Sequence, residues 1–418
     1  FVLARSMAVG ASRKAEAKAK KDAKADAKAA NVKTPQDTVQ PLSLLLGMFI
    51  VLALATWIGS ASWAESELEG RCAFPLRLFF MFAFEACLNP LCSALWLLPA
   101  RFLAPRLPGA IPDPSLPGTS LWPSPHEMQH NDDSIKWPRP EHLSAEWSAL
   151  GRGRKQPFFL NHVRGAMRLR QAAIRLGAGT ASTLTLICMS RLVDRRPLSE
   201  FGLRLDGAAL ADGALGLFTG VACIGVFFVI EWRLGWIRPT HAFEVAVDGE
   251  RWSLNILWDA LFHLGVTFNE ELQLRGWLLH SAASAFEAYL GATSSSALLL
   301  AAVVESLIFA AMHMMSPGSS WLALVNLTIG GMAAALNVVV SGGLAFALGW
   351  HFAWNLTMGH LLGLSTSGIP MSATLVSVVP HPSKAGLHGG TFGPEQSLLA
   401  PGVYMFGCAM LIMFYGWP

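Results

Sequence analysis

Three clusters of polar residues interrupt apolar, helix-forming sequence in the C-terminal half of this chain. An ionisable side chain inside a membrane-spanning helix costs about 2.5 to 3.5 kcal/mol, so such residues are functional candidates by default. Carboxylates and imidazoles can transfer protons, and their neighbours can stabilise developing charge. The clusters therefore predict an acid–base active site inside a membrane. Its candidate residues are Glu270, Glu271, Arg275, His313, His351 and Asn355.

The first cluster has a spacing that separates its two carboxylates. Glu271 and Arg275 are four residues apart, with the acid on the N-terminal side, which is the favourable order for an ion pair within a helix. Neighbouring residues on a helix diverge by about 100°. Glu270 therefore lacks a cation on its own helix, and we predict that it is the general base.

The other two clusters add imidazole and amide groups. His351 and Asn355 are one helical turn apart, so a single helix can direct both side chains to one point. Two donors directed in this way could hold an oxyanion, and each member of such a pair is worth about 100- to 1000-fold in rate. His313 comes from a separate helix, with Phe309 packed beside it one turn earlier.

Composition places this chemistry in a membrane. The chain has 418 residues, of which 53% are hydrophobic and 14% charged, and its mean hydropathy is +0.42. Soluble domains average about 25% charged residues. The formal net charge of +3 is too small, and the basic residues too scattered, to indicate a nucleic-acid partner. Six cysteines without CxxC spacing read as small buried hydrophobic residues.

The distribution of apolar segments predicts an all-α fold, a polytopic transmembrane bundle of about eight or nine helices. No stretch reads as a sheet. The bundle after residue 172 is expected to hold the active site. The expected spans are 42–64, 72–100, 172–193, 210–230, 254–286, 293–315, 321–340, 344–362 and 398–414.

Four regions follow from these patterns. Residues 1–41 form a basic, Ala- and Lys-rich tail that reads either as an organelle transit segment or as a plain charged tail. Residues 42–100 hold the N-terminal transmembrane helices. Recurrent prolines predict an extramembrane linker at 101–171, and 172–418 are expected to form the bundle that contains the clusters. An organelle membrane, plastid or endoplasmic reticulum, is therefore expected.

A competing motif occurs in the linker. Residues 126–130 read HExxH, which binds zinc when a helix presents both histidines to one metal. Prolines precede and follow this segment, and it has no apolar periodicity. We interpret it as a chance match in a polar loop.

The three clusters, in this order on successive hydrophobic helices, read EExxxR, FxxxH and HxxxN, and this arrangement resembles the CPBP (Abi) family of intramembrane endopeptidases. That family includes the CAAX prenyl endopeptidases and the bacteriocin-processing proteins. Three further segments resemble family elements outside the motifs, so the resemblance covers about 197–414. These segments are 197–203, 363–368 and 389–395.

The resemblance implies a role for each residue. Glu270 would activate the hydrolytic water together with His313. Glu271 and Arg275 would orient the site, and His351 with Asn355 would stabilise the tetrahedral oxyanion. Glu305, two turns before His313, is unexpected in an apolar helix. It either pairs with a polar neighbour or marks a polar network that differs from the family's.

Cofactor and partner expectations follow. Glutamate catalysis without a cofactor is favoured, with zinc held by Glu270, His313 and His351 as the alternative. The expected partners are membrane lipid and a membrane-tethered protein substrate, which could be a prenylated CAAX-type protein, while the N-terminal half could bind other membrane proteins. Asp259 and His263 could join the polar cavity or lie near the membrane interface. The alternative function is a non-catalytic membrane scaffold or assembly factor that keeps the fold.

Overall fold

The structure is a computed structural model that describes residues 74–103, 165–246, 250–369 and 371–416. All of them belong to one unit, Gly70–Pro418. The predicted tail, the span 42–64, most of the linker and the HExxH segment lie outside the described residues. The plastid or endoplasmic reticulum location inferred from the tail therefore stays a prediction.

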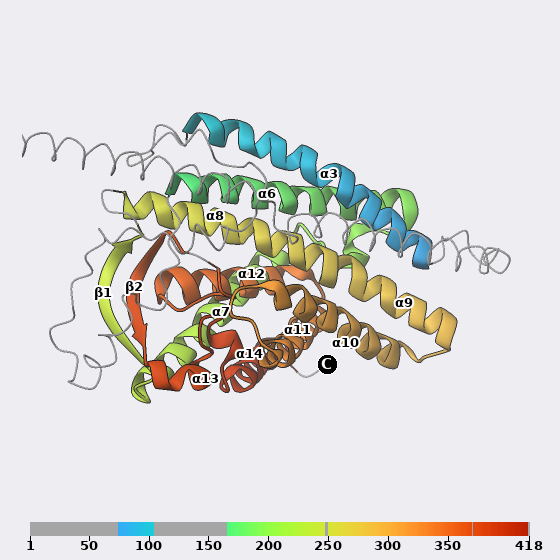
Figure 1. Ribbon diagram of the computed structural model, residues 1–418. Coiled ribbons are helices and arrows are strands. Elements are labelled where there is room, and N and C mark those ends of the chain that lie inside the picture. The colour runs from blue at the N-terminus through green and yellow to red at the C-terminus, as the bar shows by residue number, and fades with distance from the viewer. Residues whose placement is uncertain (1–73, 104–164, 247–249, 370, 417–418) are drawn as a thin grey trace, which may run out of the picture. The chain divides into compact units, whose positions relative to one another are not determined.

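Helices dominate the described residues, which confirms the all-α, polytopic fold class (Figure 1). Within the part of the chain that the structure describes, five helical segments are long and apolar enough to cross a membrane. These are Phe74–Ala100, Met167–Val193, Gly207–Arg233, Ser294–Met315 and Trp321–Ser341. The chain is thus an integral, multi-pass membrane protein.

The helices follow the chain in an order that places the three clusters on neighbouring elements. Their bounds are α3 (Phe74–Leu103), α6 (Gly165–Cys188), α7 (Gly207–Arg233), α8 (Trp252–Glu271), α9 (Leu279–Leu290), α10 (Ser294–Met312), α11 (Trp321–Ser341), α12 (Leu344–Leu356), α13 (Ala385–His388) and α14 (Ala400–Tyr415). Three π-helical segments extend some of them, namely η2 (Met189–Val193), η4 (Leu272–Leu278) and η6 (Thr357–Leu361). Short 3₁₀ turns complete the set, namely η3 (Leu198–Phe201), η5 (His313–Met315), η7 (Pro382–Lys384) and η8 (Pro394–Gln396).

Packing proceeds as a series of neighbours across the unit (Figure 1): α3 lies on α6, α6 on α8, α8 on α12, and α12 on α7. A hydrophobic core that includes Trp277, Phe309 and Leu327 joins η4, α10 and α11. A second core, with Trp350, Trp354 and Tyr404, joins α7, α12 and α14. Glu271, Arg275 and His351 lie where these two cores meet.

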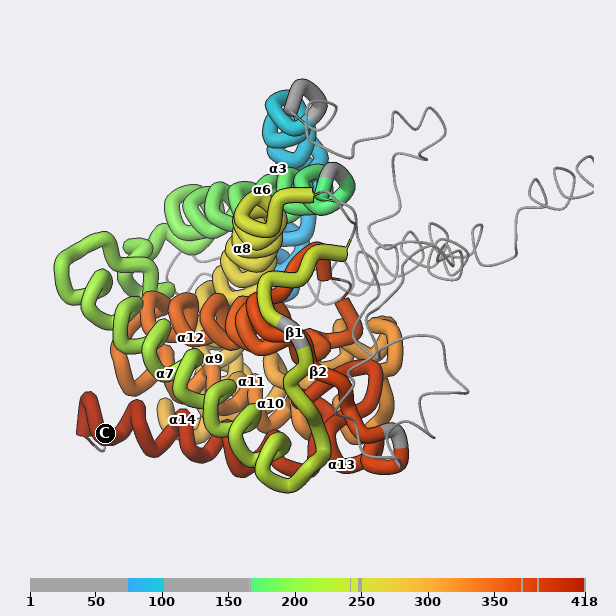
Figure 2. Tube along the Cα trace, turned by 90° about the vertical axis from the view of Figure 1, so that its left-hand side faces the viewer, coloured from blue at the N-terminus to red at the C-terminus, as the bar shows by residue number. Residues whose placement is uncertain are grey.

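A small sheet contradicts the expectation that no stretch forms strands. β1 (Ile237–Val245) pairs antiparallel with β2 (Ala373–Pro380), from Ile237 opposite Pro380 to Val245 opposite Ala373. The two strands run alongside each other in both views (Figures 1 and 2). β2 reads ATLVSVVP, which is rich in the β-branched residues that fit a pleated surface. The strand was not predicted, because a short apolar run is also consistent with a segment of buried helix.

Glycines let α7 and α12 approach closely, as small residues do between membrane helices. A Cβ atom at Gly216 would clash with the backbone carbonyl of Phe346, and one at Gly349 with that of Gly213. The two helices therefore touch backbone to backbone. This contact holds α12, which carries His351 and Asn355, against the rest of the bundle.

We expect Gly216→Ala to destabilise the protein by about 1 to 3 kcal/mol, because the added methyl group overpacks this contact. Thermal unfolding in detergent would measure the loss. Gly225→Ala is the matched control on the same helix, since a Cβ there meets nothing within 4 Å. Equal unfolding temperatures for the two variants would contradict close packing at Gly216.

Candidate active site

The first cluster spans the junction between α8 and η4. Glu270 and Glu271 end α8, and Arg275 lies in the π-helical segment that follows. The predicted pair forms, with Arg275 Nη1 3.2 Å from Glu271 Oε1, and both side chains are 1% exposed. Arg275 also reaches α10, where its Nε lies 3.4 Å from Glu305 Oε2. The unexpected Glu305 therefore pairs with a polar neighbour, and Arg275 is shared between two buried carboxyl groups.

Phe309 is the common neighbour of all three clusters. The Arg275 guanidinium lies over its ring, 4.5 Å from the centroid. The His313 ring centroid is 4.7 Å away and that of His351 is 6.4 Å away. The His313 Nδ1 lies 2.9 Å from the backbone carbonyl of Phe309 and donates to it, which leaves Nε2 available to a ligand. The ring of Phe309 thus brings the three clusters around one point.

The third cluster contacts the first directly. His351 Nδ1 lies 2.7 Å from Glu271 Oε1, so this nitrogen carries a proton that it donates to the carboxylate. Its Nε2 is 3.8 Å from Glu270 Oε2, beyond hydrogen-bond distance. A gap of this kind between two polar atoms is one that a water can bridge. The side chains of His351 and Glu270 are 15% and 12% exposed, whereas Glu271 is 1% exposed. The Oε2 atom of Glu270 is buried and has no hydrogen-bond partner among the described residues.

Two of the expected residues are less directly connected. Asn355 is buried one turn beyond His351 on α12. Within the described residues, no hydrogen bond joins His313 to Glu270 or Asn355 to His351. The roles assigned to the six residues stay predictions. What the structure establishes is that Glu271 contacts both Arg275 and His351, and that Phe309 places His313 nearby.

A cavity of about 50 Å³ adjoins this cluster. A single water needs about 10 to 15 Å³ of such volume, so the cavity can admit a small group. Its polar side is formed by Glu271, Arg275, His351 and Glu395, and its apolar side by Phe309 of α10 and residues of α11, α12 and α14. The apolar side includes Leu327, Gly330, Ala334, Trp350, Trp354 and Tyr404.

The alternative zinc set was tested by its geometry. Among the described residues, no three His, Cys, Asp or Glu side chains are close enough together to hold a metal ion. His313 and His351 lie beside Phe309, and Glu270 lies 3.8 Å from His351, but the three do not form a three-ligand cluster. As arranged, they do not fit a three-ligand zinc site, and we derive no catalytic step through a metal.

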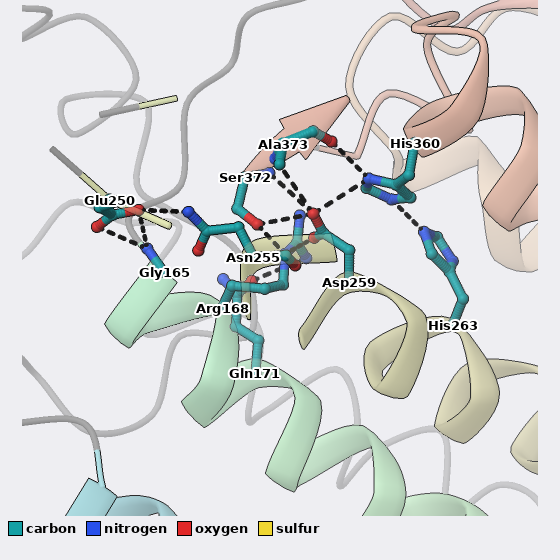
Figure 3. A network of polar contacts seen from close by, with 10 residues as sticks. All are labelled: Gly165, Arg168, Gln171, Glu250, Asn255, Asp259, His263, His360, Ser372 and Ala373. Atoms are coloured by element: carbon teal, nitrogen blue, oxygen red, sulfur yellow. Dashed lines mark hydrogen bonds and ion pairs between the residues drawn. The ribbon is translucent and has the colours of Figure 1, made fainter. Parts of the chain in front are cut away.

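A second polar cluster lies nearer the N-terminal end of α8, and sequence reasoning identified only part of it (Figure 3). Asp259 and His263 are both buried and share it with Arg168 of α6, His360 of η6 and Ser372. Asp259 and His263 therefore lie in the protein interior. His360 was missed because it follows His351 by nine residues, a spacing that does not share one face of a regular α-helix.

These features define a class: a multi-pass helical membrane protein with a buried acid, histidine and arginine cluster beside a small cavity. The comparisons refine it. Residues 252–357 match the family model described as type II CAAX prenyl endopeptidase Rce1-like. This match confirms the resemblance to the CPBP family that the three clusters indicated. No curated protein and no solved structure matches the chain.

The matched segment has a definite relation to the site. It includes all six candidate residues, from Glu270 to Asn355, and also Glu305 and Phe309. The flanking segments 197–203, 363–368 and 389–395 lie outside it, so their assignment to the family stays a prediction. The family model describes endopeptidases, and the match supports a peptidase at the level of the family.

Proposed function

We propose that this protein is an intramembrane endopeptidase that hydrolyses a peptide bond of a membrane-tethered protein substrate. The observation that carries the proposal is the arrangement of His351 between two carboxylates. Glu271 holds Nδ1 of the ring at 2.7 Å, and Nε2 faces Glu270 across 3.8 Å. A carboxylate that orients a histidine beside a reacting group is a recurrent device of hydrolases.

In the proposed mechanism, a water lies between Glu270 and His351 Nε2. Glu270 accepts a proton from that water as the water oxygen attacks the scissile carbonyl carbon. His313 helps to position the water. The carbonyl oxygen then carries the negative charge. Collapse of this intermediate breaks the C–N bond, and the proton on Glu270 passes to the leaving amine, so that atoms and charges balance.

His351 and Asn355 are proposed to stabilise the oxyanion. As an imidazolium, His351 donates from both ring nitrogens, with Nδ1 to Glu271 and Nε2 toward the reacting oxygen. Asn355 would supply a second N–H donor from the next turn of α12. Arg275 pairs with both Glu271 and Glu305, and its contact with Glu271 favours the carboxylate form that accepts from His351.

The description of the matched family, a type II CAAX prenyl endopeptidase, makes prenylated CAAX-type proteins the first candidate substrates. The test is cleavage of a panel of C-terminal peptides, prenylated and unprenylated, by the full chain purified in detergent. Cleavage that depends on Glu270 would support the proposal, and the panel would show whether the lipid is required. A folded protein that cleaves none of the peptides would favour the non-catalytic scaffold.

We expect chelators to leave this activity unchanged, because the described residues do not gather three metal ligands. The measurement is cleavage with and without a strong zinc chelator, together with the zinc content of the purified protein. Zinc retained at about one ion per chain, with activity lost on chelation and restored by zinc, would replace glutamate catalysis with metal catalysis.

A further inference from the structure

Two histidine contacts connect α8 with the helix formed by α12 and η6. At one, His351 meets Glu271, and at the other the Nε2 atoms of His360 and His263 lie 2.9 Å apart. The sequence separations differ: eight residues on α8 (263 to 271) and nine on α12–η6 (351 to 360). The π-helical η6 accounts for the difference, because an i→i+5 turn accommodates an extra residue. The two contacts are thus held in register along antiparallel helices.

The hydrogen bonds of the second contact have a defined direction. His360 Nδ1 lies 3.1 Å from Asp259 Oδ2 and 3.1 Å from the carbonyl oxygen of Ala373. Both neighbours are acceptors, so this nitrogen must carry a proton. In a neutral ring Nε2 then accepts, and His263 Nε2–H is the donor. The contact therefore joins α8 to η6 through one specific tautomer of each ring.

Asp259 is itself fixed on several sides (Figure 3). Arg168 Nε lies 2.5 Å from Asp259 Oδ1, and the Ser372 hydroxyl donates to Oδ2 at 2.7 Å. The side chains of Arg168 and Asp259 are 1% and 0% exposed. Removing one partner from a buried ion pair leaves an uncompensated charge, so the cluster resists rearrangement. It ties α6, α8, η6 and the start of β2 together.

We propose that His263 and His360, anchored by Asp259 and Arg168, form a positioning centre for the active site. By fixing the register of α12 on α8, the centre holds His351 so that Nδ1 meets Glu271 while Nε2 faces Glu270. Eight residues of helix place it about 12 Å from the Glu271–His351 contact. This inference rests on the proposed function, because it assigns these residues a part in that reaction.

The size of the expected effect follows from how sharply catalysis depends on position. A displacement of about 1 Å at a reacting group can cost about 100-fold in rate. The ring of His351 lies 2.7 Å from Glu271 and 3.8 Å from Glu270, so a small shift of α12 changes both distances. Loss of the distant contact should therefore lower turnover with little effect on substrate binding.

The test compares two replacements of His263. In His263→Phe the ring keeps its bulk but loses the donor, and we expect kcat to fall about 10- to 100-fold while KM stays within about 3-fold. In His263→Gln the terminal amide supplies an N–H near the lost Nε2, and we expect kcat within about 3-fold of wild type. A merely structural role would lower the folded yield without this rescue.

An activity-independent arm separates this inference from the proposed function. Hydrogen–deuterium exchange of the full chain should be faster in His263→Phe across α12 as well as η6. Tyr415→Phe is the control, since it removes a partly buried hydrogen bond to Asp212 on α7 instead. If wild type cleaves nothing, the proposed function fails, and exchange alone decides this inference. Equal turnover of both His263 variants and wild type, or faster exchange confined to η6, would overturn it.

Discussion

Glu270→Gln should lower peptide cleavage about 100- to 10,000-fold, the range that a general base contributes. Glutamine keeps the size of the side chain and its acceptor oxygen but cannot take a proton from water. Because Glu270 has no hydrogen bond to lose on Oε2, the fold should survive the change. Single-turnover cleavage at saturating substrate would measure the loss, with thermal unfolding to verify that the protein stays folded.

The matched control is Glu200→Gln. Its side chain is 47% exposed and pairs with Arg196 away from the site, so we expect activity within about 2-fold of wild type. Wild-type rates in a folded Glu270→Gln protein would remove Glu270 from the mechanism. A loss of the same size in Glu200→Gln would point to an indirect effect of charge.

Arg275→Met should lower the free energy of unfolding by about 3 to 5 kcal/mol, the cost of leaving buried charges unpaired. The methionine retains much of the length of the side chain but leaves Glu271 and Glu305 without their shared cation. Both carboxylates are almost completely buried. Chemical or thermal unfolding in detergent would measure the change, and cleavage should fall with it because Glu271 holds His351.

A second substitution tests this explanation. Adding Glu305→Gln to Arg275→Met removes one of the orphaned charges and should restore part of the stability. Arg204→Met is the control, because the side chains of Arg204 and its partner Asp212 are 28% and 11% exposed, against 1% for Arg275. A double variant less stable than Arg275→Met alone would show that Arg275 does not compensate Glu305.

Much of the fold could be read from hydrophobic segments, since an apolar run of helix length in a membrane protein has few alternatives. The expected span 254–286 is one continuous helical stretch through α8, η4 and α9. The pairing of β1 with β2 was not predicted. The two strands are about 130 residues apart, and their pairing depends on tertiary contacts that no local pattern reveals.

The site divides in the same way. The pair Glu271 and Arg275 was predictable, because a spacing of four residues fixes which side chains meet on a helix. The contact between His351 and Glu271 was not, because it depends on how two helices cross. His360 was not predicted because the π turn of η6 changes the helical period. The position of a π turn cannot be inferred from an α-helical pattern in the sequence.

The matched segment ends at residue 357, three residues before His360, and begins long after Arg168. The proposed catalytic residues therefore lie inside the matched segment. Two of the four proposed positioning residues, Arg168 and His360, lie outside it. Sequence similarity over the matched segment alone would identify the proposed catalytic residues but not all of the residues that position them. Substitutions that silence such an enzyme should accordingly be sought outside the recognisable region as well as within it, beginning with the helix that carries Arg168.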